Sequence, residues 1–354
     1  MIASERKKAL GQYFTREKVW LKSNVKEFIL NSKCSIAYDP FAGSGELLNL
    51  ASQLGLNLHG VDVDKKLKWE YNDSLINIPH IESAIIITNP PYLSNYSAKR
   101  KGLWREVEKY FKLTKYDNLY LLALEKMLEA QDFVVAIIPE TFLNSPFPKR
   151  RLCSINILEE NPFHDTENPV CVACFDAKHK SESEIRIYKN EHFATTLGEI
   201  EKKRLQPTNA VRIHFNRLSG QIALRAVDTT NPSKMIEFMR KRDLDYDLAG
   251  IKHSSRLITV IDINLKEEEI DAFIKTCNVL LTNFRKETDD ILLSPFKGNM
   301  KNGVRRRRLD YKTARAIMEE AFKRLRNKNQ TKTMPLTSFT KRPIEMSGKK
   351  DDLK

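Results

Sequence analysis

The sequence lacks any hydrophobic run long enough to cross a bilayer, since no window approaches the roughly 18 apolar residues that a membrane-spanning helix needs. Its first ten residues are charged rather than apolar, which is atypical of a secretion signal. Cysteine is scarce as well: the 354 residues include five, an odd number that argues against a disulfide framework and favours a reducing compartment. We therefore expect a cytoplasmic protein without membrane association.

The sequence also lacks the spacing of a metal-binding cluster. Cys171 and Cys174 form one CxxC pair, but no second pair and no histidines at zinc-finger spacing accompany them. Both lie in the alternating apolar run 170–175, which favours a strand with a structural role over zinc or redox chemistry. We expect no metal site.

Acidic residues are too few to balance the basic ones, which leaves a net charge of +14. Residues 297–354 hold 18 Lys and Arg against 6 Asp and Glu, a net charge of +12, so the excess is concentrated at the C-terminal end. Basic side chains release counterions when they neutralise phosphates, so such a segment favours a polyanionic partner. A hydrophobic fraction of 41% is otherwise ordinary for a globular protein.

Apolar runs alternate with helical stretches through the first 180 residues. Strands are expected at 35–38, 56–61, 83–88, 133–138 and 170–175, with helices at 46–54 and 118–130. Such alternation predicts an α/β fold with a doubly wound, mostly parallel sheet that binds ligands at the carboxyl ends of its strands.

The regular alternation of apolar runs and helical stretches ends after about residue 177, so we predict that the chain has three parts. Residues 1–180 are expected to form the α/β domain, 181–328 a mixed α+β domain, and 329–354 a basic, disordered tail. Within the second part, 297–308 is predicted to be a basic loop, and Asp310 is predicted to cap a following helix.

The turn Asp39-Pro40-Phe41-Ala42-Gly43-Ser44-Gly45 ends one predicted strand and opens a helix. Its glycines allow a ligand to approach the backbone closely. The turn matches neither the Walker loop nor GxGxxG, and a plain tight turn is the alternative.

Two aspartates follow in order. Asp62 ends the next predicted strand, where a carboxylate can accept hydrogen bonds from ribose hydroxyls; capping of a following helix is the alternative. Asp73 could accept a bond from the amino group of a bound adenine, or be an ordinary loop residue.

The tetrad Asn89-Pro90-Pro91-Tyr92 follows the apolar strand at 83–88. With the glycine turn and the aspartates in this order, it resembles the S-adenosylmethionine-dependent amino-methyltransferases that act on exocyclic amines of DNA bases. An adenine amine is a poor nucleophile because its lone pair is delocalised into the ring. The Asn89 side-chain oxygen and the Pro90 carbonyl can accept both of its N–H bonds and favour a tetrahedral nitrogen. Tyr92 offers a face on which an extruded base can stack.

The segment Gly11-Gln12-Tyr13-Phe14-Thr15 is similar to one found ahead of the glycine-rich loop in gamma-type adenine methyltransferases and type I modification subunits. The resemblance covers roughly residues 8–177. It implies that this segment closes over the methionine end of S-adenosylmethionine, with Thr15 at its carboxylate. The cofactor-binding residues it implies are Tyr13, Thr15, Asp39, Phe41, Gly43, Gly45, Asp62 and Asp73.

The family also places a second aromatic against the flipped base, which implies this role for Phe163 beside Asn89, Pro90 and Tyr92; a core phenylalanine is the alternative. DNA phosphates are expected to contact two basic groups, for which a solvated charged surface is the alternative. These groups are Lys99, Arg100 and Lys101 after the tetrad, and Arg305, Arg306, Arg307 and Arg308 near the C-terminal end.

These features together predict a site-specific DNA adenine-N6 methyltransferase that acts on duplex DNA as a monomer and is encoded by a prokaryote, virus or plasmid. Residues 1–180 would be its S-adenosylmethionine-binding catalytic domain, and residues 181–328 its DNA target-recognition domain. An RNA adenine methyltransferase, a protein glutamine methyltransferase and a catalytically silent DNA-binding subunit are the alternatives. Cytosine methylation is disfavoured because that group usually has serine where Asn89 stands. The recognition sequence stays open, as does the existence of a separately encoded restriction endonuclease.

Overall fold

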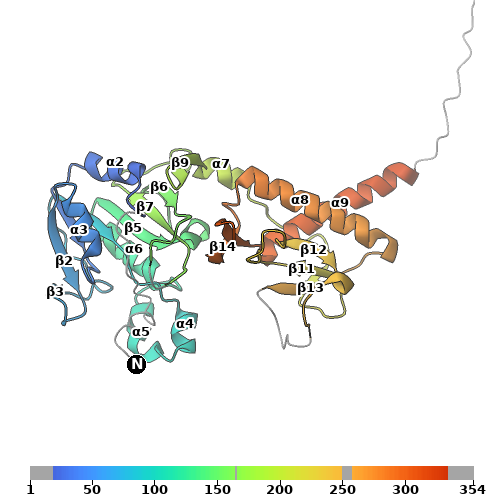
Figure 1. The fold of residues 1–354 in the computed structure, drawn as a ribbon, viewed down its shortest axis with the longest axis horizontal. Helices are drawn as coiled ribbons and strands as arrows, with labels where there is room; N and C mark the ends of the chain where they lie inside the picture. Colours follow the sequence, from blue (N-terminus) through green and yellow to red (C-terminus); the bar gives the residue numbers. More distant parts are fainter. Residues whose placement is uncertain (1–18, 164–165, 249–256, 334–354) are drawn as a thin grey trace, which may run out of the picture.

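The computed structural model describes residues 19–163, 166–248 and 257–333, with side chains as far as 327. Two bodies lie side by side along the long axis of the molecule (Figure 1). The first body is built on a large sheet, and the second combines a smaller sheet with two long helices. Tyr13 and Thr15 lie outside the described residues.

The described strands of the first sheet follow the order β3-β2-β1-β4-β5-β7-β6-β8-β9. Strands β3, β2, β1, β4 and β5 are parallel, while β7 runs antiparallel between β5 and β6. The bounds are β1 Ile36–Asp39, β2 Asn57–Asp62, β3 Glu70–Tyr71, β4 Ala84–Thr88, β5 Phe133–Pro139, β6 Leu152–Ile157, β7 Val170–Phe175, β8 Arg186–Lys189 and β9 His192–Thr196. This mostly parallel sheet confirms the predicted α/β class.

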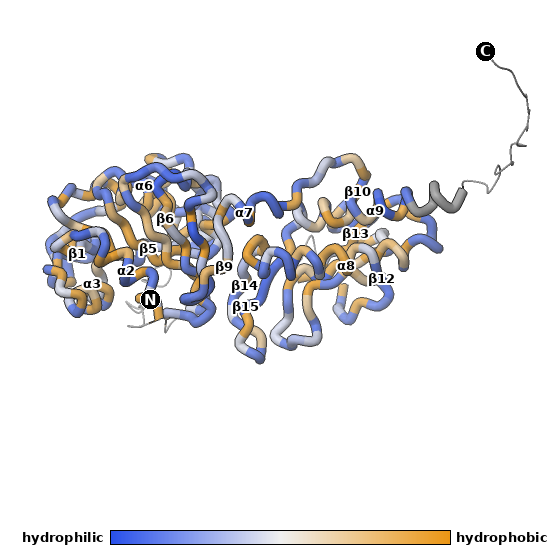
Figure 2. The backbone as a smooth tube through the Cα atoms, turned by 90° about the horizontal axis from the view of Figure 1, so that it is seen from above, coloured by the Kyte–Doolittle hydropathy of each residue, from blue (hydrophilic) through white to orange (hydrophobic). Residues whose placement is uncertain are grey.

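Helices cover both faces of this sheet. Alternate residues of β4 point to opposite sides: Ile86 joins an apolar core with α6 (Leu119–Ala130), whereas Ile85 and Ile87 join a second core with α2 (Ser23–Asn31) and α3 (Glu46–Ser52). A strand buried on both faces reads as a continuous apolar run, which is why β4 is apolar throughout. Apolar strands accordingly run through the middle of this body (Figure 2).

Two shorter helices, α4 (Asn95–Arg100) and α5 (Trp104–Phe111), follow the tetrad, and the 3-10 turn η1 (Glu140–Asn144) follows β5. In Figure 1, α4 and α5 project from the first body beside the junction of the two bodies.

The first body ends later than predicted. Strand β8 pairs with β6 and strand β9 pairs with β8, so the sheet continues to Thr196 rather than ending at about residue 180. Helix α7 (Leu197–Lys202) then leads to the second body. The predicted boundary was wrong because β8 completes a sheet begun far upstream, a pairing that has no local sequence signal.

The second body has an antiparallel sheet in the order β10-β13-β11-β12 among the described strands. Helices α8 (Ile270–Thr288) and α9 (Tyr311–Thr333) pack against each other, and α8 packs on β12. The strand bounds are β10 Ile213–Phe215, β11 Ile222–Arg225, β12 Glu237–Arg240 and β13 Ile258–Ile263, with 3-10 turns η2 at Lys241–Asp243 and η3 at Glu267–Glu269.

Residues 297–308 are not the predicted loop. They belong to a hairpin of β14 (Ser294–Asn299) and β15 (Arg305–Arg308), whose pairing shifts register between Pro295 and Asn299. Asp310 caps α9 as predicted, since its Oδ1 accepts from the backbone N–H of Thr313 at 2.9 Å. The helix then continues to Thr333, past the predicted start of the tail.

Strand β7 contains Cys171 and Cys174, both buried with free thiols. Among the described residues, no group of three His, Cys, Asp or Glu is arranged to hold a metal ion. No described helix has both the length and the apolar composition required to cross a membrane.

Candidate active site

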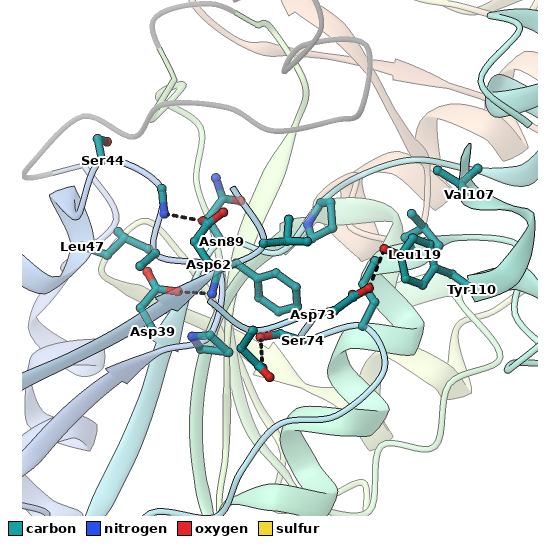
Figure 3. A pocket seen from close by; sticks show the side chains of 18 of the residues that line it. Asp39, Ser44, Leu47, Asp62, Asp73, Ser74, Asn89, Val107, Tyr110 and Leu119 are labelled. Carbon is teal, nitrogen blue, oxygen red and sulfur yellow. Dashed lines mark hydrogen bonds between the residues drawn. The ribbon is translucent and has the colours of Figure 1, made fainter. Parts of the chain in front are cut away.

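A cavity opens at the carboxyl ends of β1, β2 and β4 (Figure 3). This is the edge at which parallel α/β sheets bind ligands, because the loops that leave adjacent strands diverge there. The cavity brings together most of the predicted cofactor residues with the first residue of the tetrad. Its lining includes Asp39, Phe41, Gly43, Asp62, Asp73 and Asn89.

The glycine turn has the backbone conformation that its sequence predicts. Gly43 and Gly45 have φ angles of +51° and +87°, a region that side chains with a Cβ rarely adopt. Gly45 precedes α3, and its N–H donates to the Ala42 carbonyl at 2.7 Å. The Trp69 indole N–H donates to the Gly43 carbonyl at 2.9 Å, and this hydrogen bond stabilises the turn. Gly43 lines the cavity, whereas Gly45 shapes the turn without lining it.

We expect Gly45→Ala to destabilise the protein and weaken cofactor binding. A Cβ there would lie 2.7 Å from Cζ2 of Trp69, in addition to the left-handed backbone penalty of about 1–2 kcal/mol. Gly55→Ala is the matched control, because Gly55 has a φ of +82° but open space around its Cβ position. Urea unfolding and calorimetric cofactor titration of both variants measure the difference. Equal losses in the two variants would show that the contact with Trp69 does not matter.

Asp39 is fully buried at the end of β1. Its Oδ1 accepts from the backbone N–H of Phe41 at 2.9 Å and from the Thr88 hydroxyl at 2.5 Å, so it ties the glycine turn to β4. Burial raises the pKa of Asp39 to about 7; the nearby Asp62 carboxylate adds to this, and the two hydrogen bonds oppose it. A direct contact of Asp39 with the cofactor stays a prediction.

This raised pKa predicts a pH dependence of stability. Between the ordinary value of 3.8 and about 7, the folded protein holds a proton on Asp39 that the unfolded chain has lost. The contribution of Asp39 is therefore fully present below pH 3.8 and is lost as the pH rises through 7, by up to about 1.4 kcal/mol per pH unit. Asp39→Asn removes this titration, so the stability of the variant relative to wild type should rise from pH 5 to pH 7. Urea unfolding across this range measures it, and parallel profiles would contradict it.

Asp62, at the end of β2, is 8% exposed and borders the cavity. Its Oδ2 accepts from the Gly43 N–H at 2.9 Å, and its Oδ1 accepts from the Asp64 N–H at 2.8 Å. Residues 63–69 form turns and bends rather than a helix, so helix capping does not explain Asp62. Each carboxylate oxygen has a second lone pair, which leaves acceptor capacity for ribose hydroxyls.

Asp73 lies across the cavity, where helix α5 meets it (Figure 3). Its Oδ2 accepts from the Tyr110 hydroxyl at 2.9 Å and from the Lys109 ammonium at 3.0 Å. Glu106, Val107 and Tyr110 of α5 also line the cavity, a role that the sequence did not reveal. The one available signal was the amphipathic pattern of residues 104–111, which does not show what the apolar face covers.

The tetrad leaves β4 directly beside this cavity. The Tyr92 hydroxyl lies 2.5 Å from Oδ1 of Asn89 and 2.6 Å from the Ile137 carbonyl of β5, so these two acceptors share its single proton. The Tyr92 ring makes edge contacts with Phe163, 2% exposed, and with Tyr120, at centroid distances of 6.2 and 6.3 Å. Pro90 is buried. Two residues of the tetrad, Asn89 and Pro91, line the cavity. Phe163 thus lies next to Tyr92; its contact with a base stays a prediction.

The first basic group lies on α4 and just beyond it. Lys99, Arg100 and Lys101 are exposed. The Lys99 ammonium lies 4.5 Å from the Trp104 ring centroid, which holds α4 against α5. Partial burial and the neighbouring charges of Arg100 and Lys297 lower the pKa of Lys101. Lys297 belongs to β14, so a basic residue of the second body lies close enough to Lys101 to affect its pKa.

The second basic group is only partly exposed. Arg305 and Arg307 are 3% and 1% exposed, and both bond within the protein: Arg305 to the Leu158 carbonyl at 2.8 Å and Arg307 to the Glu140 carboxylate. These two side chains are structural, which corrects the expectation that all four arginines contact DNA. Alternation along β15 turns these two inward; Arg306 and Arg308 are partly exposed, and their DNA contacts stay predictions.

No protein-family model and no curated protein matches the sequence. Several solved structures show distant similarity, among them the following three. A presumed RNA methyltransferase from Pyrococcus horikoshii is 20% identical, with a TM-score of 0.28, over 50% of this chain and 100% of that one. The M protein of the type I restriction enzyme EcoKI is 10% identical, with a TM-score of 0.31, over 86% and 70%. WbdD, crystallised with a kinase inhibitor, is 10% identical, with a TM-score of 0.26, over 75% and 55%. Similarity at this level assigns neither a substrate nor an activity to this chain.

Proposed function

We propose that this protein is a site-specific DNA adenine methyltransferase that transfers the methyl group of S-adenosylmethionine to the N6 amine of an adenine rotated out of duplex DNA. The observation that carries the proposal is the shared position of Asn89, which lines the cavity and belongs to the tetrad beside it. A nucleophile held by the tetrad and a donor held in the cavity would therefore meet at one point.

The cavity residues fit the proposed cofactor. The turn at Gly43 lets a ligand approach the backbone, and Asp62 borders the cavity with acceptor capacity for ribose hydroxyls. Asp73 and the α5 residues Val107 and Tyr110 provide a carboxylate and an apolar wall for an adenine ring. S-adenosylmethionine bound there would supply an electrophilic methyl group.

The residues of the chain itself would prepare the acceptor amine. The Asn89 side-chain oxygen and the Pro90 carbonyl accept its two N–H bonds, which stabilises a tetrahedral nitrogen and exposes its lone pair. The Tyr92 ring, fixed by its hydroxyl and by the edge contacts with Phe163 and Tyr120, provides a surface for the extruded base. Fixed dipoles thus favour attack by the neutral amine without a general base: the N–C bond would form as the S–C bond of the donor breaks and the thioether leaves, and the methylated nitrogen would then lose one N–H proton to water. Holding both reactants in place lowers the entropy cost of their encounter.

Duplex DNA is the proposed acceptor because basic residues of the two bodies lie near one another at Lys101. Lys99, Arg100 and Lys101 belong to the first body, and Lys297 belongs to the second. Lys and Arg side chains gain affinity for a phosphate backbone through counterion release. We propose that the duplex lies across the junction of the two bodies and that the chain acts as a monomer. Whether a separately encoded restriction endonuclease accompanies it stays open.

Methyl transfer from tritiated S-adenosylmethionine to matched polymers tests this proposal. The substrates are a mixed-sequence DNA duplex, RNA of the same sequence, a G·C-only DNA duplex, and a protein acceptor with accessible glutamines. We expect label in the mixed DNA duplex alone. Label in RNA or in protein would show that RNA or protein, rather than DNA, is the substrate. Label in the G·C-only duplex would show that the methylated base is not adenine.

A further inference from the structure

A buried ion pair joins the two bodies next to the tetrad. The Arg307 guanidinium of β15 donates to the Glu140 carboxylate at the start of η1, and the side chains are 2% and 3% exposed. Within the described part of the chain, the other carboxylate oxygen of Glu140 has no hydrogen-bond partner. Arg307 is the described cation that forms an ion pair with this buried carboxylate, and the charge of the buried Arg305 also acts on it.

Glu140 is attached to the segments that hold the base-stacking residues. It directly follows Pro139, the last residue of β5, and the Ile137 carbonyl of β5 accepts from the Tyr92 hydroxyl. The Glu140 N–H donates to the Pro169 carbonyl at 3.0 Å, which ties η1 to the β6–β7 connection that carries Phe163.

Arg307 is fixed just as firmly within the second body. Its N–H donates to Oδ2 of Asp228 at 3.0 Å, and its carbonyl accepts from the Asp228 N–H at 3.0 Å. Asp228 is fully buried and also accepts two bonds from Arg285 of α8, at 2.8 and 3.0 Å. The ion pair of Asp228 with Arg285 of α8 is thus linked through backbone hydrogen bonds of Arg307 to the Arg307–Glu140 ion pair.

We propose that Glu140 and Arg307 are a positioning pair that fixes the orientation of the C-terminal body over the Asn89–Tyr92 tetrad, and thereby determines which adenine reaches Asn89. The inference rests on the proposed function. Burying two charges is costly unless their geometry is good, so the pair favours one arrangement of the bodies over nearby ones. A neutral contact of the same size would let the two bodies change their relative orientation at little cost in free energy.

The partly exposed pair Lys189–Asp289, whose lysine also lies 3.6 Å from the Glu159 carboxylate, is the control. It also joins the two bodies, at 2.9 Å, but Asp289 is 63% exposed, so water can solvate either charge if the bodies move. If contact area alone held the two bodies together, loss of either ion pair would change their arrangement and the site selectivity to the same extent. The proposal instead predicts a change only when the buried pair is lost.

The test compares wild type with Glu140→Gln/Arg307→Met, Arg307→Lys and Lys189→Met. The double variant removes both buried charges and so avoids the unpaired charge that could prevent a single variant from folding. Small-angle scattering and calorimetric cofactor titration measure the arrangement of the bodies and the integrity of the cavity without any methyl transfer. Sequencing of methylated adenines in a random-sequence duplex library measures site selectivity.

We expect the double variant to bind cofactor like wild type, to scatter as a more variable particle, and to lose at least about tenfold in selectivity between preferred and other sites. Arg307→Lys, which keeps the charge, should recover part of this loss, and Lys189→Met should match wild type. Unchanged scattering and unchanged selectivity in the double variant would overturn the proposal, as would an equal effect of Lys189→Met. Absence of methyladenine with wild type would instead overturn the proposed function, while the scattering comparison would still test the pair.

Discussion

Asn89→Ala is expected to lower the rate of methyl transfer by about 10²–10³-fold, the cost typical of removing one preorganised dipole from a transition state. The variant deletes the side-chain acceptor for one amine N–H, so the amine nitrogen keeps its lone pair in the ring. The Tyr92 hydroxyl retains its bond to the Ile137 carbonyl, so the stacking surface should stay in place. A single-turnover rate at saturating cofactor and DNA isolates this step from binding.

Asn95→Ala is the control for this comparison. Asn95 begins α4 and donates from its side chain to Asp117 at 2.7 Å, so its loss changes the same segment without touching the tetrad. Its single-turnover rate should stay near that of wild type. A rate for Asn89→Ala that also stays near wild type would mean that the tetrad does not carry the chemistry.

Asp62→Ala is expected to weaken cofactor binding by about 10–100-fold, because a hydrogen bond to a charged group contributes roughly 1.5–3 kcal/mol. The substitution removes the proposed acceptor of ribose hydroxyls and also releases the Gly43 N–H, so the glycine turn loses a support. Calorimetric titration with S-adenosylmethionine or its demethylated product measures the loss.

Two further variants separate the parts of this effect. Asp62→Asn keeps an acceptor oxygen without the charge, so its affinity should lie between those of wild type and Asp62→Ala. Asp64→Ala changes a neighbouring carboxylate that accepts from the Lys66 N–H at 3.0 Å and is absent from the cavity lining. Equal affinities of Asp62→Ala and Asp64→Ala would show that Asp62 does not contact the cofactor.

Local patterns in the sequence were sufficient to predict five strands of the first sheet, β1, β2, β4, β5 and β7, and the placement of several candidate site residues at their ends. The apolar runs that predict strands at 83–88 and 133–138 correspond to β4 and β5, which lie within one residue of these bounds. Parallel strands end at the same edge of a sheet, so residues that follow them, such as Asp62 and Asn89, had to come close together. The cavity that both residues line confirms this part of the prediction.

Features that depend on distant partners could not be predicted. Glu140 and Arg307 lie 167 residues apart, and a run of four arginines looks the same in sequence whether it faces solvent or a buried carboxylate. The same limit applies to β8, whose pairing with β6 moved the domain boundary, and to α5, whose apolar face covers the cavity. Each of these three contacts joins segments that are distant in sequence, so only the folded structure reveals it.

Nucleoside analysis by mass spectrometry tests the central claim most directly. Wild type and Asn89→Ala are incubated with S-adenosylmethionine and unmethylated duplex DNA, which is then digested to nucleosides. The account predicts N6-methyldeoxyadenosine with wild type, its loss with Asn89→Ala, and no methylated cytosine with either protein. Methylated cytosine, or no methylated nucleoside from wild-type protein that still binds the cofactor, would contradict it.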